Sequence, residues 1–326
     1  MKKAFNFIHT EKVNFPVAIM ARVLKVNRTA YYNWARRPPS KRELEDRDLT
    51  RQIKEIHAGN RGVYGSPRIH AELRIARGIK VGRKRVERLM VDARISGLVK
   101  KRWGKTTIRV PGVRVAGDLL LRDFTATAPD QIWAADITYL RTWEGWVYLA
   151  VVQDLYSRKI VGWSMADHMR AELVVDALKM AVHRRQPERG LTFHSDQGSQ
   201  FVSLAFGQLA RANGIAQSMG HVGSAYDNAI AETFFATLKK ELIHRRSWPT
   251  KAELRPEVFE FIEGFYNRKR RHGYLGWLSP AEFEDQVSLV LTETTQSQDA
   301  SPVNKASSGS GEIHSSATRS STRASP

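Results

Sequence analysis

The chain has 326 residues, 42% of them hydrophobic, and it contains no cysteine. That length is enough for one to three domains with a buried core. The lack of cysteine excludes disulfide bonds and cysteine-ligated zinc. The first residues lack the apolar segment of a secretory signal, and no stretch approaches the ~18 apolar residues of a membrane span. We therefore expect a cytoplasmic protein without a membrane partner.

The net charge is +19, and the excess of positive charge lies near the start of the chain. Residues 1–115 contain 29 Lys and Arg against 9 Asp and Glu, whereas the remaining residues contain 23 and 24. Charge that serves only solubility is expected to spread along the whole chain. A local excess is typical of a module that binds a polyanion, so this distribution favours nucleic acid as a partner.

The first helical pattern in this basic region covers residues 15–37. Apolar side chains at helical spacing stop near Val26, and a second helical run follows through Tyr31 and Trp34. Asn27 is a plausible N-cap of the second run because its side chain can accept from the free amides of the first turn. The pattern predicts a helix-turn-helix, and the alternative is an ordinary helical hairpin with a solvated basic face.

The second helical pattern covers residues 64–90. Ser66 is a candidate cap, Pro67 suits the first helical position, and Gly78 is expected to end the helix. Two helix-turn-helix patterns in tandem on a basic background favour DNA binding. We expect phosphate contacts from four side chains of the last helix: Arg83, Lys84, Arg85 and Arg88.

The next region alternates strands and helices. Residues 116–124 are predicted to form a linker. Three apolar runs joined by short turns predict strands at 131–140, 146–155 and 159–168. The pattern then predicts a helix at 170–186, a strand at 191–196, a helix at 200–214, a strand at 215–219 and a helix at 228–243. This order predicts an α/β fold with a mixed sheet and helices on both faces. The polar, Ser-rich residues 286–326 are predicted to be a disordered tail.

Three carboxylates of the α/β region are candidate metal ligands. Asp136 lies inside an apolar strand, Asp196 ends another strand, and Glu232 lies on a helix beside an apolar face of Phe235, Leu238 and Leu242. Taken singly, each is better explained by structure: Asp136 as a satisfied buried acid, Asp196 as a helix cap and Glu232 as a solvated helix position. Together they offer hard oxygen ligands, which suit Mg²⁺ or Mn²⁺ rather than zinc. His194 is expected to shape the site, and Gly198 to let the backbone turn after Asp196.

Four segments carry a resemblance to a known family. They are WAADITYL, FHSDQGSQF, AYDNAIAETFFATLKKEL and YNRKRRHGYLGWLSP. They resemble the integrase core of bacterial insertion-sequence transposases, in the two-reading-frame group whose catalytic frame is similar to retroviral integrase. As in that family, 35 residues separate Asp196 from Glu232, and Lys239 follows seven residues after Glu232. The resemblance also covers Asp227, Asn228, Tyr266, Asn267, Arg271 and His272, and leaves their roles open.

The resemblance implies a ribonuclease-H-like fold preceded by an all-α helix-turn-helix region. Asp136, Asp196 and Glu232 are then the catalytic, metal-binding DDE triad for two Mg²⁺ ions, with Mn²⁺ as a substitute, and Lys239 contacts DNA. The implied activity is that of a DNA transposase, with metal-dependent phosphodiester cleavage and strand transfer during DNA integration of an insertion sequence.

The resemblance also implies the partners. These are the element ends and target DNA, further copies of the chain assembled on that DNA, and the product of an upstream reading frame, as a partner or as a frameshift fusion. The protein would then associate with the nucleoid.

The predicted domains are a basic DNA-binding region at 1–115, a linker at 116–124, a catalytic core at 125–285 and a tail at 286–326. Two other functions fit parts of this pattern. The first is a non-catalytic DNA-binding protein, in which the three acids would have no role. The second is a ribonuclease-H-like nuclease, which would not explain the basic first region.

Overall fold

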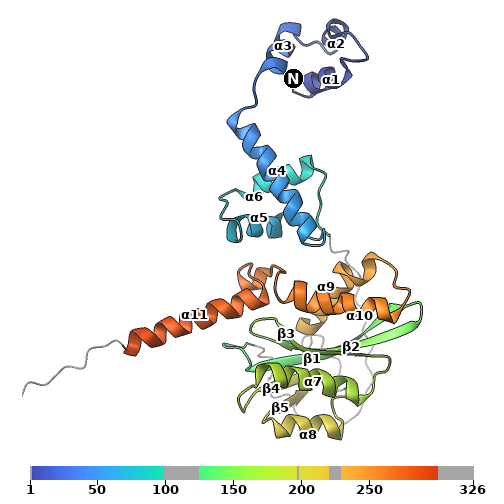
Figure 1. Ribbon diagram of the computed structural model, residues 1–326, viewed down its shortest axis with the longest axis vertical. Coiled ribbons are helices and arrows are strands. Elements are labelled where there is room, and N and C mark those ends of the chain that lie inside the picture. The colour runs from blue at the N-terminus through green and yellow to red at the C-terminus, as the bar shows by residue number, and fades with distance from the viewer. Residues whose placement is uncertain (1, 99–124, 197, 220–228, 300–326) are drawn as a thin grey trace, which may run out of the picture. The chain divides into compact units, whose positions relative to one another are not determined.

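The structure is a computed structural model, and it describes residues 2–98, 125–196, 198–219 and 229–299 (Figure 1). The side chains of residues 2, 229–231 and 290–299 are outside that description. The chain forms one compact unit as far as Glu284, and the residues from Asp285 onward form a second. The predicted linker at 116–124 lies outside the described residues.

The first helices form a small cluster with a core of its own. The helices are α1 (Lys2–Glu11), α2 (Val17–Val23) and α3 (Arg28–Arg36). Their core consists of Phe5, Ile8, Met20, Ala21 and Tyr31. The side chain of Asn27 accepts a hydrogen bond from the amide of Ala30 at 3.1 Å, so the predicted N-cap is confirmed.

A second group of helices follows, consisting of α4 (Lys41–Gly59), α5 (Ser66–Ile75) and α6 (Arg83–Asp92). The sequence pattern did not predict α4, which begins with a capping box between Ser40 and Glu43. Ser66 is not a cap: Gly65 occupies that position, and the Ser66 hydroxyl donates to Glu87 Oε1 at 3.1 Å instead. A side chain inside the first turn can reach a neighbouring helix, and here that contact replaces the expected cap.

The predicted order of strands and helices is confirmed. The elements are β1 (Ile132–Thr142), β2 (Gly145–Asp154), β3 (Ile160–Ala166), α7 (Ala171–Arg185), β4 (Thr192–Ser195), α8 (Leu204–Ala212), β5 (Ala216–Met219) and α9 (Ala229–Glu241). The sheet order is β3-β2-β1-β4-β5, with β1, β2 and β3 antiparallel and β1, β4 and β5 parallel. This is the mixed sheet expected of a ribonuclease-H-like fold.

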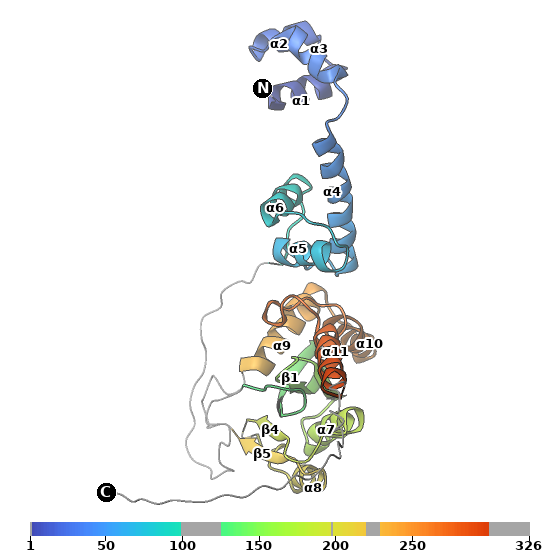
Figure 2. The same cartoon turned by 90° about the vertical axis from the view of Figure 1, so that its left-hand side faces the viewer.

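Helices cover both faces of the sheet. Figure 1 and Figure 2 show α7 and α8 on one face and α9 on the other. Apolar side chains of α7 and α8 pack with Trp133 and Phe193 of the sheet, and the α9 face packs with Leu140 and Leu149. Gly162 permits the close approach of α7 to β3, since a Cβ there would lie 2.2 Å from the carbonyl oxygen of Ala177.

The described chain continues in helical segments after α9. These are the 3-10 turn η1 (Ile243–Arg245), α10 (Lys251–Phe259), the π-helical segment η2 (Glu260–Tyr266), the 3-10 turn η3 (Gly273–Leu275) and α11 (Pro280–Asp299). Helix α11 runs past residue 286, where the sequence composition placed the start of a disordered tail. Residues 286–299 contain no Gly or Pro, so nothing breaks the helix there. The rest of the tail lies outside the described residues.

Helices α4 to α6 share a hydrophobic cluster with η2. The cluster includes Ile53, Tyr64 and Leu73 from the helical region and Phe261 and Phe265 from η2. The Tyr64 hydroxyl donates to the carbonyl of Lys269 at 3.2 Å and accepts from the amide of Arg271 at 2.8 Å. The described residues of the predicted regions 1–115 and 125–285 therefore contact each other through buried side chains.

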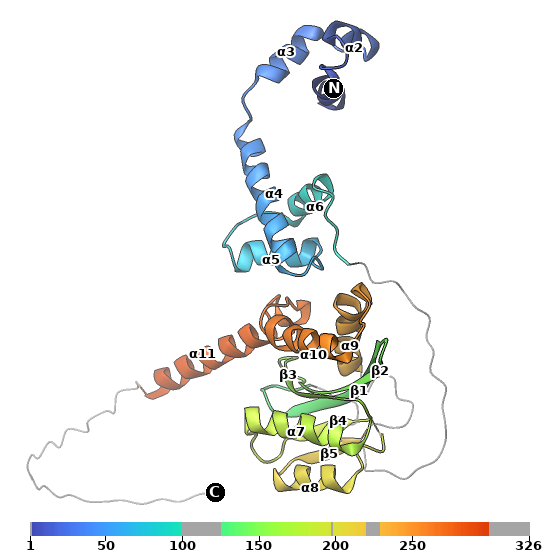
Figure 3. The same ribbon diagram turned by 45° about the vertical axis from the view of Figure 1, so that its right-hand side comes forward.

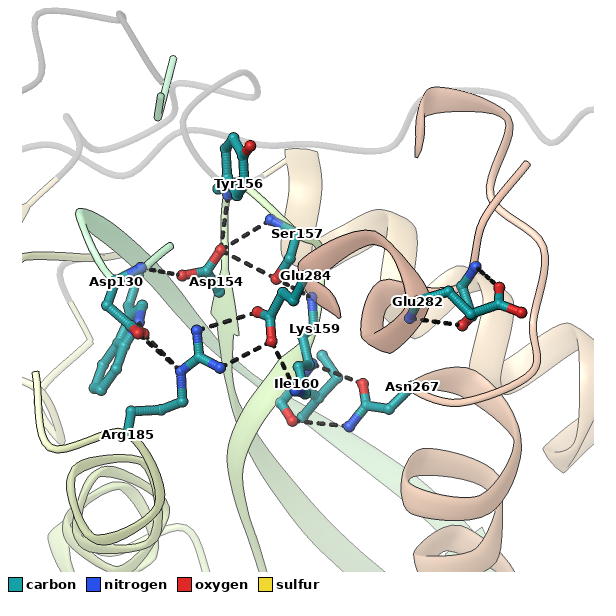
Figure 4. A network of polar contacts seen from close by, with 12 residues as sticks. Asp130, Asp154, Tyr156, Ser157, Lys159, Ile160, Arg185, Asn267, Glu282 and Glu284 are labelled. Atoms are coloured by element: carbon teal, nitrogen blue, oxygen red, sulfur yellow. Dashed lines mark hydrogen bonds and ion pairs between the residues drawn. The ribbon is translucent and has the colours of Figure 1, made fainter. Parts of the chain in front are cut away.

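A buried polar network joins the start of β1 to the end of α7 and the start of α11 (Figure 4). Arg185 donates to Asp130 at 2.8 Å and to Glu284 at 2.9 Å, and Lys159 donates to Glu284 at 2.7 Å. Burial raises the pKa of Asp154, although the amides of Ser157 and Asp130 donate to its carboxylate. This network provides polar partners for Asp154 and Glu284, two buried acids that lie outside the candidate site.

Candidate active site

Strand pairing brings the first two candidate acids together. Strands β1 and β4 run parallel, with Ala135 opposite Ser195. The next position on β1 is Asp136 and the residue that follows β4 is Asp196. Because neighbouring strands lie about 4.8 Å apart, the two carboxylates leave adjacent backbone positions. Asp136 is half-buried and Asp196 is exposed.

Helix α9 carries the third acid. Phe234, Phe235 and Leu238 of α9 are buried in the cluster that also contains Leu140 of β1. The predicted apolar face of this helix is therefore confirmed, with Phe234 as an addition. Glu232 is exposed beside that face, so packing of α9 on the sheet fixes the helix while leaving its carboxylate accessible.

The three acids act on one another electrostatically. The pKa of Asp136 is raised to about 7, mainly by burial and in addition by the negative charges of Asp196 and Glu232. The amide of Ile137, which donates to Asp136 at 2.7 Å, and the charge of Lys239 act in the opposite direction. A carboxyl group in this position is stabilised in its charged form by a nearby cation.

Lys239 supplies one such positive charge. Burial lowers the pKa of its half-buried side chain, and the negative charge of Asp136 offsets only part of this effect. Its Nζ lies 5.0 Å from the centre of the Tyr139 ring. Lys239 therefore shares the electrostatic environment of the acids. Lys240, the next residue, donates to the carbonyl of Leu98 at 2.9 Å.

The donor set fits a hard divalent cation. All three candidate ligands are carboxylates, and the negative charges of Asp196 and Glu232 disfavour the charged form of Asp136 unless a cation is bound. Within the described residues, no group of three or more His, Cys, Asp or Glu side chains is close enough to hold a metal ion. The structure thus places Asp136 and Asp196 on neighbouring strand positions, with Glu232 on the helix that covers this part of the sheet. The three acids are not at the distances of a metal site. Asp227 and Asn228 lie outside the described residues.

Two residues next to Asp196 support its position. His194 is fully buried and its Nδ1 lies 3.1 Å from the Ser218 hydroxyl of β5, in agreement with a role in shaping the site. Gly198 lies close to the acid: its amide donates to Asp196 at 3.2 Å, and a Cβ would lie 3.0 Å from the same carboxylate, which would then have to shift. The following helix begins only at Leu204, with Ser203 as its N-cap.

The residues of the YNRKRRHG segment have structural contacts. The Asn267 side chain bonds both the amide and the carbonyl of Ile160 at 2.9 Å, and the Tyr266 hydroxyl accepts from Gln153 at 3.1 Å. Arg271 pairs with Glu72 at 2.8 Å. Burial, followed by the charge of Arg270, lowers the pKa of His272 well below its usual value, so this ring is neutral near pH 7.

The sequence pattern missed one buried ion pair. Arg270 donates to both carboxylate oxygens of Glu241, at 2.8 and 2.9 Å, and both side chains are buried. Arg68 of α5 approaches the same carboxylate at 3.6 Å. One signal was available: Glu241 follows Leu238 by three residues and so lies on the apolar face of α9.

The four basic residues of α6 are placed differently from one another. Arg85 and Arg88 both pair with Asp46 of α4, at 2.7 and 2.6 Å. Arg83 pairs with Glu87 within α6 at 3.0 Å. Lys84 is exposed. Two of the expected phosphate contacts therefore already hold α6 against α4.

Comparison with known proteins identifies the family. An integrase core domain matches residues 126–225 and 213–280, and an HTH-like domain matches residues 43–103. The transposase InsF of insertion sequence IS3A from Escherichia coli strain K12 is 38% identical over 285 residues, which cover 86% of this chain and 98% of that protein. The chain belongs to the IS3 family of insertion-sequence transposases. It is accordingly a DDE-type transposase, an enzyme of DNA integration, as the resemblance implied.

The chain is also similar to a second insertion-element protein and to a solved structure. An uncharacterized 31 kDa protein of insertion element IS600 from Shigella sonnei is 40% identical and covers 82% of this chain and 98% of that protein. Among solved structures, the HTLV-2 integrase catalytic core domain in complex with magnesium is 16% identical, with a TM-score of 0.39, and covers 49% of this chain and 99% of that chain. No helix among the described residues of the transposase is long and apolar enough to cross a membrane.

Proposed function

We propose that Asp136, Asp196 and Glu232 hold divalent cations and form the centre at which this transposase cuts and joins DNA. The observation that supports this proposal is that Asp196, which follows β4, and Glu232 of α9 both act electrostatically on the half-buried Asp136 of β1. Carboxylates gathered for DNA binding alone would repel its phosphates. Their gathering therefore favours metal-dependent chemistry over the non-catalytic alternative.

The proposed cofactor is a pair of Mg²⁺ ions, with Mn²⁺ as a substitute. Two such ions stabilise the attacking and the leaving oxygen of an in-line phosphoryl displacement. Water attacks a phosphodiester at the element end and breaks its bond to the 3′ oxygen, which leaves a 3′-hydroxyl and a 5′-phosphate. That hydroxyl then attacks a phosphodiester of target DNA, which forms a new phosphodiester and releases a 3′-hydroxyl of the target strand. The three carboxylates position both reactions. No side chain is needed as a nucleophile, so no covalent protein–DNA intermediate is expected.

The proposed assembly is an oligomer of this chain on the element ends, associated with the nucleoid. It acts together with the product of an upstream reading frame or as a frameshift fusion with it. Incubating the chain with labelled element-end DNA and Mg²⁺, with and without the upstream product, tests this proposal. We expect 3′-hydroxyl ends and strand-transfer products that disappear when EDTA removes the metal. Their absence under both conditions would overturn the proposed function.

Lys239 is proposed to hold a DNA phosphate near the scissile bond. We expect Lys239→Ala to lower cleavage about tenfold or more while leaving Mn²⁺ affinity within about twofold, since a phosphate contact strengthens DNA positioning and not metal binding. The assay compares initial cleavage rates and Mn²⁺ titrations.

Lys179→Ala is the matched control for Lys239→Ala, because Lys179 is an exposed helical lysine of α7, 62% of its side chain being accessible. Lys240 is unsuitable as a control since it bonds the carbonyl of Leu98. Equal, mild effects of Lys239→Ala and Lys179→Ala would make Lys239 an ordinary lysine.

DNA binding is proposed to depend mainly on residues 1–115, with Lys84 as an exposed phosphate contact. We expect Lys84→Ala to reduce the slope of log affinity against log salt concentration by about 0.9, the value for one lost contact with duplex phosphate. Fluorescence anisotropy with labelled end DNA measures the slope. Lys179→Ala again serves as the control, and an unchanged slope in Lys84→Ala would remove this residue from the interface.

Full-length variants are the appropriate test of this binding region. A fragment that begins near residue 125 would lack α4 to α6, which share a hydrophobic cluster with Phe261 and Phe265. Loss of DNA binding by such a fragment would therefore not distinguish loss of DNA contacts from loss of folding. Single charge changes on the exposed face of α6 leave that cluster intact.

A further inference from the structure

The hairpin of β1 and β2, whose first strand carries Asp136, exposes aromatic side chains. Tyr139 of β1 is 57% exposed and Trp146 of β2 is 45% exposed. Their rings meet edge to face, with centroids 5.0 Å apart and an interplanar angle of 83°. Large aromatic side chains left accessible within a strand pair add little to the core, so their exposure calls for another explanation.

The two rings lie on one face of the hairpin because of the strand register. Tyr139 pairs with Tyr148 and Arg141 pairs with Trp146, so these four side chains alternate with those that point to the opposite face. Tyr148 is half-buried against the cluster that includes residues of α7. The aromatic face thus continues outward from the core, along the hairpin that Figure 3 shows extending beyond the other strands.

Two cations flank the ring pair. The Arg141 guanidinium lies 5.9 Å from the centre of the Trp146 ring, and the Lys239 ammonium lies 5.0 Å from the centre of the Tyr139 ring. Cations over accessible ring faces, beside rings that can stack, are the combination with which proteins bind unpaired nucleic-acid bases and their phosphates.

Because side chains alternate along a strand, Asp136 points to the face opposite Tyr139, and the edge of β1 lies between the two. Strand β4 pairs with β1 only as far as Ala135, so among the described residues the edge of β1 beyond that point has no strand partner. The backbone positions of Asp136 and Tyr139 both lie on this open stretch, about 10 Å apart along the strand, with their side chains on opposite sides of it. That distance is about three base-pair rises of DNA. Lys239 connects the two, because it influences Asp136 and lies near the Tyr139 ring.

We propose that Tyr139 and Trp146 form a stacking platform for an unpaired DNA base within about three nucleotides of the scissile phosphate, with Arg141 and Lys239 binding the adjoining phosphates. This inference rests on the proposed function, since it places the scissile phosphate at Asp136. The alternative occupant is a second copy of the chain. The flanking cations favour DNA, because they complement phosphates.

Abasic DNA tests the platform directly. Element-end DNA carries a single abasic residue at each of the first three positions on either side of the scissile phosphate, and its affinity is measured without divalent cations. We expect one position at which removing the base weakens binding of the unchanged transposase about tenfold, the lower range for one base stacked on an aromatic side chain. Removing the same base should not further weaken DNA binding by the variant Tyr139→Leu/Trp146→Leu, since that variant has already lost the stacking contact.

Matched variants separate stacking from other effects. Tyr139→Phe/Trp146→Phe keeps both ring faces and should retain the tenfold sensitivity. Tyr274→Leu is the control, because Tyr274 is also exposed and also lies under a guanidinium, that of Arg158 at 4.6 Å, but on η3. Melting temperatures check that each variant is folded.

Three outcomes would overturn the platform. The first is that no abasic position weakens binding by the unchanged transposase, a result that does not depend on any variant. The second is that the losses from abasic DNA and from the Leu variant add at every position. The third is that the Leu variant changes the oligomeric mass while its DNA affinity stays the same. Because binding is measured without divalent cations, failure of the metal proposal would appear separately, as absent cleavage.

Discussion

Asp136→Asn, Asp196→Asn and Glu232→Gln are each expected to reduce Mg²⁺-dependent strand transfer to below a few per cent of the unchanged level. Each change removes a negative oxygen donor, and groups that act as a unit lose activity together when one of them is removed. The assay is strand transfer of labelled element-end DNA, with single-turnover cleavage measured in parallel.

The fold should survive these changes. Asp196 and Glu232 are exposed, and Asp136 lies among charges of its own sign. Removing one charge therefore relieves repulsion, and the melting temperature of each metal-free variant should not fall below that of the unchanged transposase. A variant that keeps more than a few per cent of its Mg²⁺-dependent activity would show that its acid does not belong to the triad. Glu188→Gln, which changes an acid in the turn after α7, serves as the control and should leave activity unchanged.

Arg270→Met is expected to lower the free energy of unfolding by about 3–5 kcal/mol, the usual cost of removing one partner from a buried ion pair. The change leaves the Glu241 carboxylate, whose side chain is only 6% exposed, with Arg68 alone at 3.6 Å. Glu241 is the last residue of α9, the helix that carries Glu232 and Lys239. Loss of the pair should therefore lower both stability and cleavage. Urea unfolding measures the first effect.

Two comparisons make the Arg270 result specific. Arg246→Met removes an exposed pair with Glu257, in which the side chains are 55% and 38% exposed, and should cost less than about 1 kcal/mol. The double variant Arg270→Met/Glu241→Leu should regain part of the lost stability, because it removes the unpaired charge along with its partner. If Arg270→Met costs no more than Arg246→Met, the buried pair does not hold α9 in place.

The sequence by itself determined the order of the elements from β1 to α9 and the positions of the acids within them. The strand and helix periods, the Asn27 cap and the apolar face of α9 depend on residues within a few positions of one another, so each is visible locally. Asp136 is conspicuous because a charged residue interrupts an apolar strand, and Asp196 because it ends one. The spacing to Glu232 and Lys239 then identified the family from which the triad was inferred.

Only the tertiary structure decided which charges are available and which are already paired. Arg85 and Arg88, which are predicted to contact DNA phosphates, also pair with Asp46, about forty residues away in the sequence, because α6 packs on α4. Packing also pairs Arg270 with Glu241 and places Lys239 beside the Tyr139 ring. The close approach of the Asp196 and Gln200 side chains to Gly198 is likewise visible only in the tertiary structure. Such contacts depend on how distant elements pack, and no local period or cap encodes that packing.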